Sequence, residues 1–144
     1  MKPVEQIISD ARAALNRGEL GVAEKLFSLA AENSAAPDAW NGLGAIRFEQ
    51  GNLEESARCF EKAKAMALES HGGVVPKRLE WNPENKPLLR ALQGIGLNLF
   101  RAGRTAEARK SFQELLKINP EDNQGAQNLL DDLDAGKNPW KTGL

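Results

Sequence analysis

Few side chains in this sequence have the chemistry that catalysis requires. The 144 residues include one histidine, His71, and one cysteine, Cys59, whereas enzymes generally need an activated nucleophile or a group that shuttles protons. Cys59 directly precedes Phe60 in an apolar helical pattern, which favours a packing role. His71 stands beside Gly72 at the expected end of a helix, where a protonated imidazole can cap the last turn. We therefore expect no catalytic residue and no enzyme activity.

Acidic pairs and glycine pairs are the other features that suggest a ligand site. Neighbouring residues on a helix point about 100 degrees apart, so adjacent carboxylates favour helix starts and solvated faces over a metal site. The acidic pairs are Glu54-Glu55, Glu121-Asp122 and Asp131-Asp132. Two glycine pairs, Gly42-Leu43-Gly44 and Gly94-Ile95-Gly96, fall inside helical patterns and do not follow strands, unlike phosphate-binding loops. The sequence predicts neither a bound metal nor a cofactor.

Composition narrows the class of protein. Lysine and arginine number 19 against 20 aspartates and glutamates, so the chain lacks the basic field expected of a nucleic-acid binder. Charged residues interrupt the first twenty positions, which argues against a signal peptide, and no apolar run approaches the roughly 20 residues that span a bilayer. One cysteine cannot form an internal disulfide. We expect a cytoplasmic protein that is not inserted in a membrane.

The elements that carry these residues repeat along the chain. Aligning the segments that begin at Gly18, Gly51 and Gly103 gives one pattern of glycine, a position that is apolar in the first two segments, small residue and aromatic residue. Its copies are Gly18, Leu20, Ala23, Phe27, Ala30; Gly51, Leu53, Ser56, Phe60, Ala63; and Gly103, Thr105, Ala108, Phe112, Leu115. A second apolar stripe with helical spacing precedes each glycine. Each unit is therefore predicted to be a pair of helices.

Particular residues of these units resemble a known family. Trp40, Leu43 and Gly44, followed by Gly51, Phe60 and Ala63, and the terminal Pro120 of the third copy, are similar to the tetratricopeptide repeat (TPR) consensus. The resemblance implies an all-α fold, a right-handed α-solenoid of three TPR helix pairs with a C-terminal capping helix. The stretch Asn119 to Gly125 is also similar to a subset of bacterial repeat proteins, which favours a bacterial source.

The spacing of the copies predicts the domain organisation. Gly18 and Gly51 are 33 residues apart, and Gly51 and Gly103 are 52 apart. Because one repeat is about 34 residues long, the second interval holds about 18 extra residues, whose prolines and paired glycines predict a long loop. We expect one domain over residues 1–136, with repeats at about 4–36, 37–70 and 88–121, a loop at about 71–87, a cap helix at about 122–135 and a tail at 137–144.

Helix ends and close contacts follow from the same alignment. The expected helices cover about residues 3–17, 20–33, 37–50, 53–70, 86–102, 105–118 and 122–134. Asn52 with Glu55 resembles a capping box, Asp122 is expected to cap the last helix and Gly136 to end it. Gly44 and Gly96 are expected to let paired helices approach while Phe60 and Phe112 fill the space beside them.

The resemblance also implies a site. In this family the first helices of successive repeats line a concave groove that binds a peptide segment of a partner protein. The matching positions are Glu5, Ile8, Arg12, Asn16, Asp38, Asn41, Ala45, Glu49, Arg90, Gln93, Leu97 and Arg101. Amide and guanidinium groups there could hold a main chain or a carboxylate, and an ordinary solvated face is the alternative. The subtype that grips chaperone carboxylates is disfavoured, because Ile8, Arg12 and Gly42 stand at its matching positions.

Two tryptophans outside the repeats leave alternatives open. Trp81, in the loop, is expected to fold back over apolar surface, or else to contact a partner from the groove edge. Trp140, in the tail, either docks or stays mobile. The predicted function is a non-catalytic protein–protein interaction module, an adaptor, scaffold or co-chaperone-like protein. Self-association as a structural protein and a role as an enzyme subunit are the alternatives.

Overall fold

The computed structural model describes residues 2–34 and 36–140. Within these residues the chain forms seven α-helices and no β-strand, which confirms the all-α prediction. Six of the seven expected helix ranges agree with the structure to within one residue at each end. The helices are α1 (Val4–Asn16), α2 (Leu20–Asn33), α3 (Pro37–Glu49), α4 (Leu53–Glu69), α5 (Lys86–Arg101), α6 (Thr105–Ile118) and α7 (Ala126–Asp134).

The exception is α7, which begins at Ala126 and not at residue 122. Asp122 and Gly125 have φ angles of 55° and 75°, and this left-handed backbone cannot belong to a right-handed helix. The Asp122 carboxylate still accepts hydrogen bonds from the backbone N–H groups of Ala126 and Gln127, at 2.6 and 3.0 Å. The capping role expected of Asp122 is confirmed, but the residue acts from a turn outside the helix.

Two other predicted helix ends have a definite outcome. The Asn52 side chain accepts a hydrogen bond from the N–H of Glu55 at 3.3 Å, as expected. The reciprocal half of the capping box is replaced by the backbone, because the N–H of Asn52 donates to the carbonyl of Arg47 at 2.9 Å. Gly136 follows α7 with a φ of 70°, and its N–H returns to the carbonyl of Leu133 at 3.1 Å. Gly136 therefore ends α7 as predicted.

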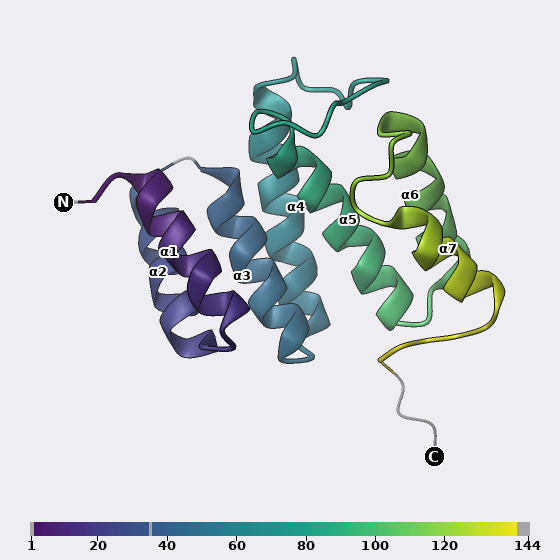
Figure 1. The fold of residues 1–144 in the computed structure, drawn as a ribbon, viewed down its shortest axis with the longest axis horizontal. Helices are drawn as coiled ribbons and strands as arrows, with labels where there is room; N and C mark the ends of the chain where they lie inside the picture. The colour runs from purple at the N-terminus through teal and green to yellow at the C-terminus, as the bar shows by residue number, and fades with distance from the viewer. Residues whose placement is uncertain (1, 35, 141–144) are drawn as a thin grey trace.

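The helices pack in chain order, as Figure 1 shows from α1 at one end to α6 and α7 at the other. Each helix lies mainly against the next, in the pairs α1 with α2, α3 with α4, and α5 with α6. The first helices of successive pairs also touch, α1 against α3 and α3 against α5. Such an array buries each apolar stripe only through its neighbours. This arrangement is the predicted solenoid of helix pairs.

Glycine and phenylalanine set the distance between the helices. The Phe60 ring lies against Gly44 of its own pair and Gly94 of the next, so an ideal Cβ on those glycines would lie 2.9 and 2.5 Å from the ring. The same arrangement recurs for Phe27 against Gly42 at 2.3 Å and for Phe112 against Gly96 at 2.7 Å. The expected role of Gly44 and Gly96 is confirmed. The structure adds that Gly42 and Gly94 make the contact between pairs.

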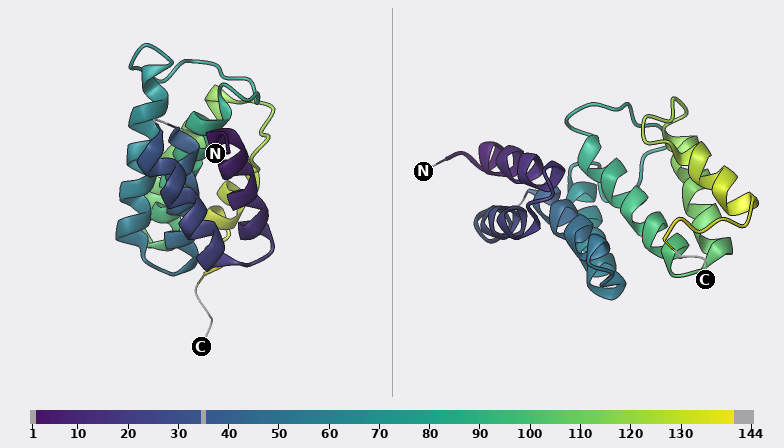
Figure 2. Two further views of the ribbon diagram at one scale, coloured as in Figure 1. Left: turned by 90° about the vertical axis from the view of Figure 1, so that its left-hand side faces the viewer. Right: turned by 60° about the horizontal axis from the view of Figure 1, so that its bottom comes forward.

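The segment between α4 and α5 arches over the ends of both helices (Figure 1 and Figure 2). Leu79 fixes its middle: the side chain is buried, the N–H donates to the carbonyl of Ile118 at 2.9 Å, and the carbonyl accepts from the Asn119 side chain at 3.0 Å. Trp81 is half-buried and packs against the core cluster of α5 to α7. The loop therefore belongs to the folded domain because it buries apolar side chains of its own.

Candidate functional site

The predicted groove positions fall on one face of three adjacent helices. We call the face of α1, α3 and α5 that carries these positions the inner face, and its residues recur every three or four positions along each helix. Figure 1 shows the three helices lying beside one another. Its residues are Glu5, Ile8, Arg12 and Asn16 on α1, Asp38, Asn41, Ala45 and Glu49 on α3, and Arg90, Gln93, Leu97 and Arg101 on α5.

Asp38 joins the three helices at one end of the inner face. Its Oδ2 lies 3.1 Å from a guanidinium nitrogen of Arg12 and 2.9 Å from one of Arg90. Its Oδ1 accepts a hydrogen bond from Asn41 Nδ2 at 3.0 Å, and the same Nδ2 donates to the carbonyl of Pro87 at 2.9 Å. Two guanidinium groups therefore share one carboxylate, which leaves this part of the face with an excess of positive charge.

Partial burial makes that charge costly. The pKa of Arg12 is lowered, first by desolvation; attraction to Asp38 opposes the shift and repulsion from Arg90 adds to it. Arginine nevertheless stays protonated in the physiological range. An additional anion or a carbonyl oxygen beside Arg12 and Arg90 would relieve their mutual repulsion, so the chemistry of this cluster suits an acceptor group.

Gln93 lies in the α5 part of the inner face and is hydrogen-bonded to Gln124, from the turn before α7. Its Nε2 donates to the carbonyl of Gln124 at 2.9 Å, and Gln124 Nε2 donates back to Gln93 Oε1 at 2.9 Å. Gln124 Nε2 also donates to the carbonyl of Leu89 at 3.1 Å. Gln93 is thus held within the chain, and Gln124 is an inner-face contact that the sequence alignment did not predict.

Arg101 marks the opposite end of the inner face, where α3 and α5 finish. Its Nη1 donates to the carbonyl of Phe48, and its guanidinium carbon lies 5.0 Å from the centre of the Phe48 ring. Trp140 from the tail meets Phe48 and Phe100 edge-on, with ring centres 5.3 and 5.2 Å away. The question left open for Trp140 is therefore answered: the tryptophan docks.

The apolar and acidic positions complete the inner face. Ile8, Ala45 and Leu97 are half-buried, and Glu49 is exposed. Trp81 borders the face at the loop end, because the guanidinium carbon of Arg90 lies 5.6 Å from its ring centre. The structure thus gathers Arg12, Asp38, Asn41 and Arg90 at one end and Arg101 at the other, with small and aliphatic side chains between them.

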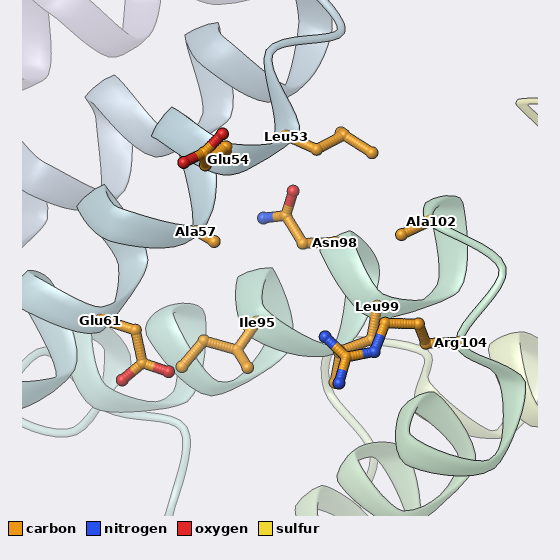
Figure 3. Close-up of a pocket in the computed structure, with 9 residues that line it drawn as sticks. All are labelled: Leu53, Glu54, Ala57, Glu61, Ile95, Asn98, Leu99, Ala102 and Arg104. Atoms are coloured by element: carbon orange, nitrogen blue, oxygen red, sulfur yellow. The ribbon is translucent and has the colours of Figure 1, made fainter.

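A separate cleft of about 360 Å³ lies between α4 and α5, as Figure 3 shows. Its α5 residues, Ile95, Asn98 and Leu99, fall between the inner-face positions in the sequence and so lie on other sides of the helix. Asn98 donates through Nδ2 to Ser56 Oγ at 3.0 Å and to the carbonyl of Gly94 at 3.1 Å. Asn98 therefore ties α5 to α4 in this cleft.

The two residues with catalytic potential have structural surroundings. His71 meets the carbonyl of Ala67 through Nδ1 at 3.1 Å and Oδ1 of Asn85 through Nε2 at 3.0 Å. Two acceptors favour the doubly protonated ring, and the pKa of His71 is raised, first by Asn85 and then by Ala67. Burial raises the pKa of the Cys59 thiol, which keeps it a poor nucleophile. His71 thus caps α4, as predicted.

Two further observations on the described residues concern membrane-spanning helices and clusters of metal-binding side chains. In the part of the chain that the structure describes, none of the helices combines the length and the apolar character that crossing a bilayer requires. Nor do residues 2–34 and 36–140 bring three or more histidine, cysteine, aspartate or glutamate side chains together in a way that could hold a metal ion.

The repeat pattern matches a known protein family. A family model described as a tetratricopeptide repeat matches residues 35–121, which is more than half of the 144 residues. The matched region runs from just before α3 to just after α6 and so includes Asp38, Asn41, Arg90 and Arg101. No curated protein matches the sequence.

Proposed function

We propose that this chain, which belongs to the tetratricopeptide repeat family, is a non-catalytic module that binds a peptide segment of a partner protein on its inner face. Repeat arrays of this family generally serve as protein-interaction scaffolds, because stacked helix pairs present an extended surface. The observation that carries the proposal is the Arg12, Asp38 and Arg90 cluster, which spans three successive first helices. A segment lying across the face would meet charge from all three repeats.

The chemistry of the inner face suggests what the segment contains. Arg12 and Arg90 share one carboxylate and favour a partner carboxylate or main-chain carbonyl. Ala45 and Leu97 are half-buried farther along α3 and α5 and favour aliphatic side chains. The proposed ligand is therefore a peptide with an acidic or carbonyl-rich end at α1 and apolar residues farther along. Fixed guanidinium groups would orient it, and apolar contact would hold it.

The decisive experiment is capture of partners from cell extract on the immobilised full chain, followed by mass spectrometry and direct binding of the captured protein. Arg90→Ala and Arg101→Ala test the inner face. Arg58→Ala is the matched control, because Arg58 is exposed on α4 and its ion pairs among the described residues are with Glu54 and Glu55. Thermal melting establishes that each variant is folded.

We expect both inner-face variants to weaken binding several-fold, mainly by slowing association, and the Arg58 control to leave it unchanged, since fixed charges steer and orient a ligand even where their hydrogen bonds are only exchanged. Unchanged binding by folded Arg90→Ala and Arg101→Ala would reject the inner face as the partner site.

A second candidate is self-association, favoured by apolar side chains left on the outside of the terminal pair. Val22 and Leu29 on α2 are 49% and 46% exposed and lie seven residues apart, on one side of the helix. Contiguous exposed apolar patches often mark protein contacts. Light scattering across a range of concentrations tests this alternative. A mass that stays monomeric up to about 100 μM would exclude self-association of ordinary strength.

A further inference from the structure

Two phenylalanines lie beside the predicted positions of the inner face. Phe48 lies three residues beyond Ala45, and Phe100 three beyond Leu97, so helical geometry places each on the same side of its helix as the inner-face residue before it. In the structure Phe48 and Phe100 are buried, with 8% and 2% of their surface exposed. Trp140 covers this end of the face, and its ring contacts both phenylalanines edge-on.

The tail crosses this end of the inner face in a turn that places Trp140 against the two phenylalanines. Gly136 turns the chain away from α7, and residues 138–140 then pass beneath the carboxyl end of α5 (Figure 1). Asn138 Oδ1 accepts from the N–H of Trp140 at 3.1 Å, while its Nδ2 donates to the carbonyl of Phe100 at 3.3 Å. Pro139 restricts the backbone between them. The tail therefore presents its tryptophan from a tight side-chain-stabilised turn.

The contacts described for residues 138–140 are modest. Trp140 is half-buried, Pro139 is exposed, and the side-chain hydrogen bond from Asn138 to Phe100 is near the long end of the normal range. The phenylalanines beneath, by contrast, belong to helices packed on both sides. Departure of the tail would thus uncover the Phe48 and Phe100 rings at this end of the inner face.

We propose that the slot between Phe48 and Phe100 is the subsite for a tryptophan of the partner segment, and that residues 138–140 occupy it in the free chain. The inference rests on the proposed function and adds the partner's anchor residue and an intramolecular competitor. An indole suits the slot because the Trp140 ring already lies there, nearly perpendicular to both phenylalanine rings, and the Arg101 guanidinium lies over the Phe48 ring. The partner must displace the tail before its own aromatic residue can bind.

The factor by which the tail weakens binding of an external peptide can be estimated. A short tether supplies an effective concentration of about 1 mM, so an external peptide faces competition by a factor of about one plus 1 mM divided by the peptide's own Kd. If the peptide binds the empty slot with a Kd of about 0.1 mM, the occupied slot binds it about tenfold more weakly. This factor is what the experiment measures.

The test uses the full chain and a blocked, fluorescein-labelled peptide of residues 135–140, Ala-Gly-Lys-Asn-Pro-Trp. Fluorescence anisotropy gives its Kd for the wild type and for Trp140→Ala. We expect a submillimolar Kd for Trp140→Ala and about tenfold weaker binding to the wild type. Lys137→Ala is the matched control, because it changes an exposed side chain of the same tail, leaves Trp140 in place and should retain the wild-type competition.

Two further reagents keep the result interpretable. A peptide with alanine in place of its tryptophan should not bind either chain. Asn138→Ala keeps the indole but removes the hydrogen bond to the Phe100 carbonyl, and should give competition between that of the wild type and that of Trp140→Ala. A melting temperature of Trp140→Ala within about 4 °C of the wild type is expected of a displaceable tail; a drop above about 10 °C would make it part of the core and overturn the proposal.

Other outcomes also overturn the inference. Absence of binding to folded Trp140→Ala would show that the slot accepts no external aromatic segment, and equal binding to both chains would show that the tail does not guard it. A wild-type dimer that Trp140→Ala abolishes would assign the slot to the tail of a second copy instead. No natural partner is involved, so failure here leaves the capture experiment with Arg90→Ala and Arg101→Ala to be judged separately.

Discussion

Gly42→Ala is the substitution whose effect the structure specifies most sharply. Alanine normally stabilises the interior of a helix by about 1 kcal/mol relative to glycine. At Gly42, however, a Cβ would lie 2.3 Å from the Phe27 ring, whereas ordinary contacts of this kind are 3.4 to 4 Å. Phe27 is only 1% exposed, so its ring has no free space into which it could move. The substitution therefore sets a steric overlap against a gain in helix propensity.

The steric overlap should outweigh the gain in helix propensity. Inserting a methyl group into a packed core costs about 1 to 3 kcal/mol, and an overlap above 1 Å argues for the upper end of that range. After the gain of about 1 kcal/mol, the expected net loss in the free energy of unfolding is about 1 to 2 kcal/mol. This corresponds to a fall in melting temperature of about 3 to 8 °C for a domain of this size.

Gly21→Ala is the matched control because Gly21 also lies in a helix and nothing approaches its Cβ position within 4 Å. Calorimetry and urea unfolding should show Gly21→Ala to be as stable as the wild type or more stable by up to about 1 kcal/mol. In a Phe27→Leu background, the further loss caused by Gly42→Ala should shrink, because the two side chains no longer meet. A Gly42→Ala protein that gains stability would refute close packing between helix pairs.

Three further outcomes follow from individual contacts. Asp38→Asn should lower the free energy of unfolding by about 1 to 2 kcal/mol in urea titrations, because Arg12 and Arg90 lose a carboxylate that is 18% exposed; an unchanged midpoint would contradict the cluster's role in joining the repeats. The pKa of His71 is raised, so the stability that its protonated ring contributes should be complete below about pH 6.5 and disappear as pH rises through the folded-state pKa. The melting temperatures of wild type and His71→Ala should therefore differ at about pH 6 and converge by about pH 9. A difference that does not depend on pH would exclude the charged cap. Cys59 should react with a thiol reagent far more slowly in the native chain than in urea, whereas equal rates would contradict its burial.

The periodicity of the sequence was enough to predict the helices. Gly51 and Phe60 recur as Gly103 and Phe112 with the spacing of one helix face, and the left-handed φ of Gly51 and Gly103, 78° and 83°, places each glycine in the turn between paired helices. Local signals of this kind act within one turn of the chain, and so a single sequence reports them. The late start of α7 escaped prediction because Asp122 is a capping residue type, and the sequence pattern did not show that left-handed backbone at Asp122 and Gly125 keeps that segment in a turn.

The candidate site was predicted only in part. The resemblance to tetratricopeptide repeats placed Asn41, Arg90 and Arg101 on one face, but their hydrogen-bond partners lie 46, 52 and 53 residues away in sequence. Such contacts depend on how neighbouring repeats meet, which periodicity within a repeat does not encode. Phe48 had a usable signal, its three-residue offset from Ala45. Docking of Trp140 had none, because the tail has no repeat counterpart.

The hydrogen bonds that inner-face residues make within the chain affect how the proposed partner segment would bind. Gln93, Arg90 and Arg101 already have hydrogen-bond acceptors within the chain, so a peptide would mainly exchange one polar contact for another. Such exchanges contribute little net free energy, although fixed charges still orient a ligand and speed its arrival. Affinity must then come chiefly from apolar surface, and the slot of Phe48 and Phe100 is a part of the inner face where a large ring is already accommodated. Loss of inner-face arginines should accordingly change association rates and salt dependence, whereas loss of the partner's aromatic anchor should change dissociation.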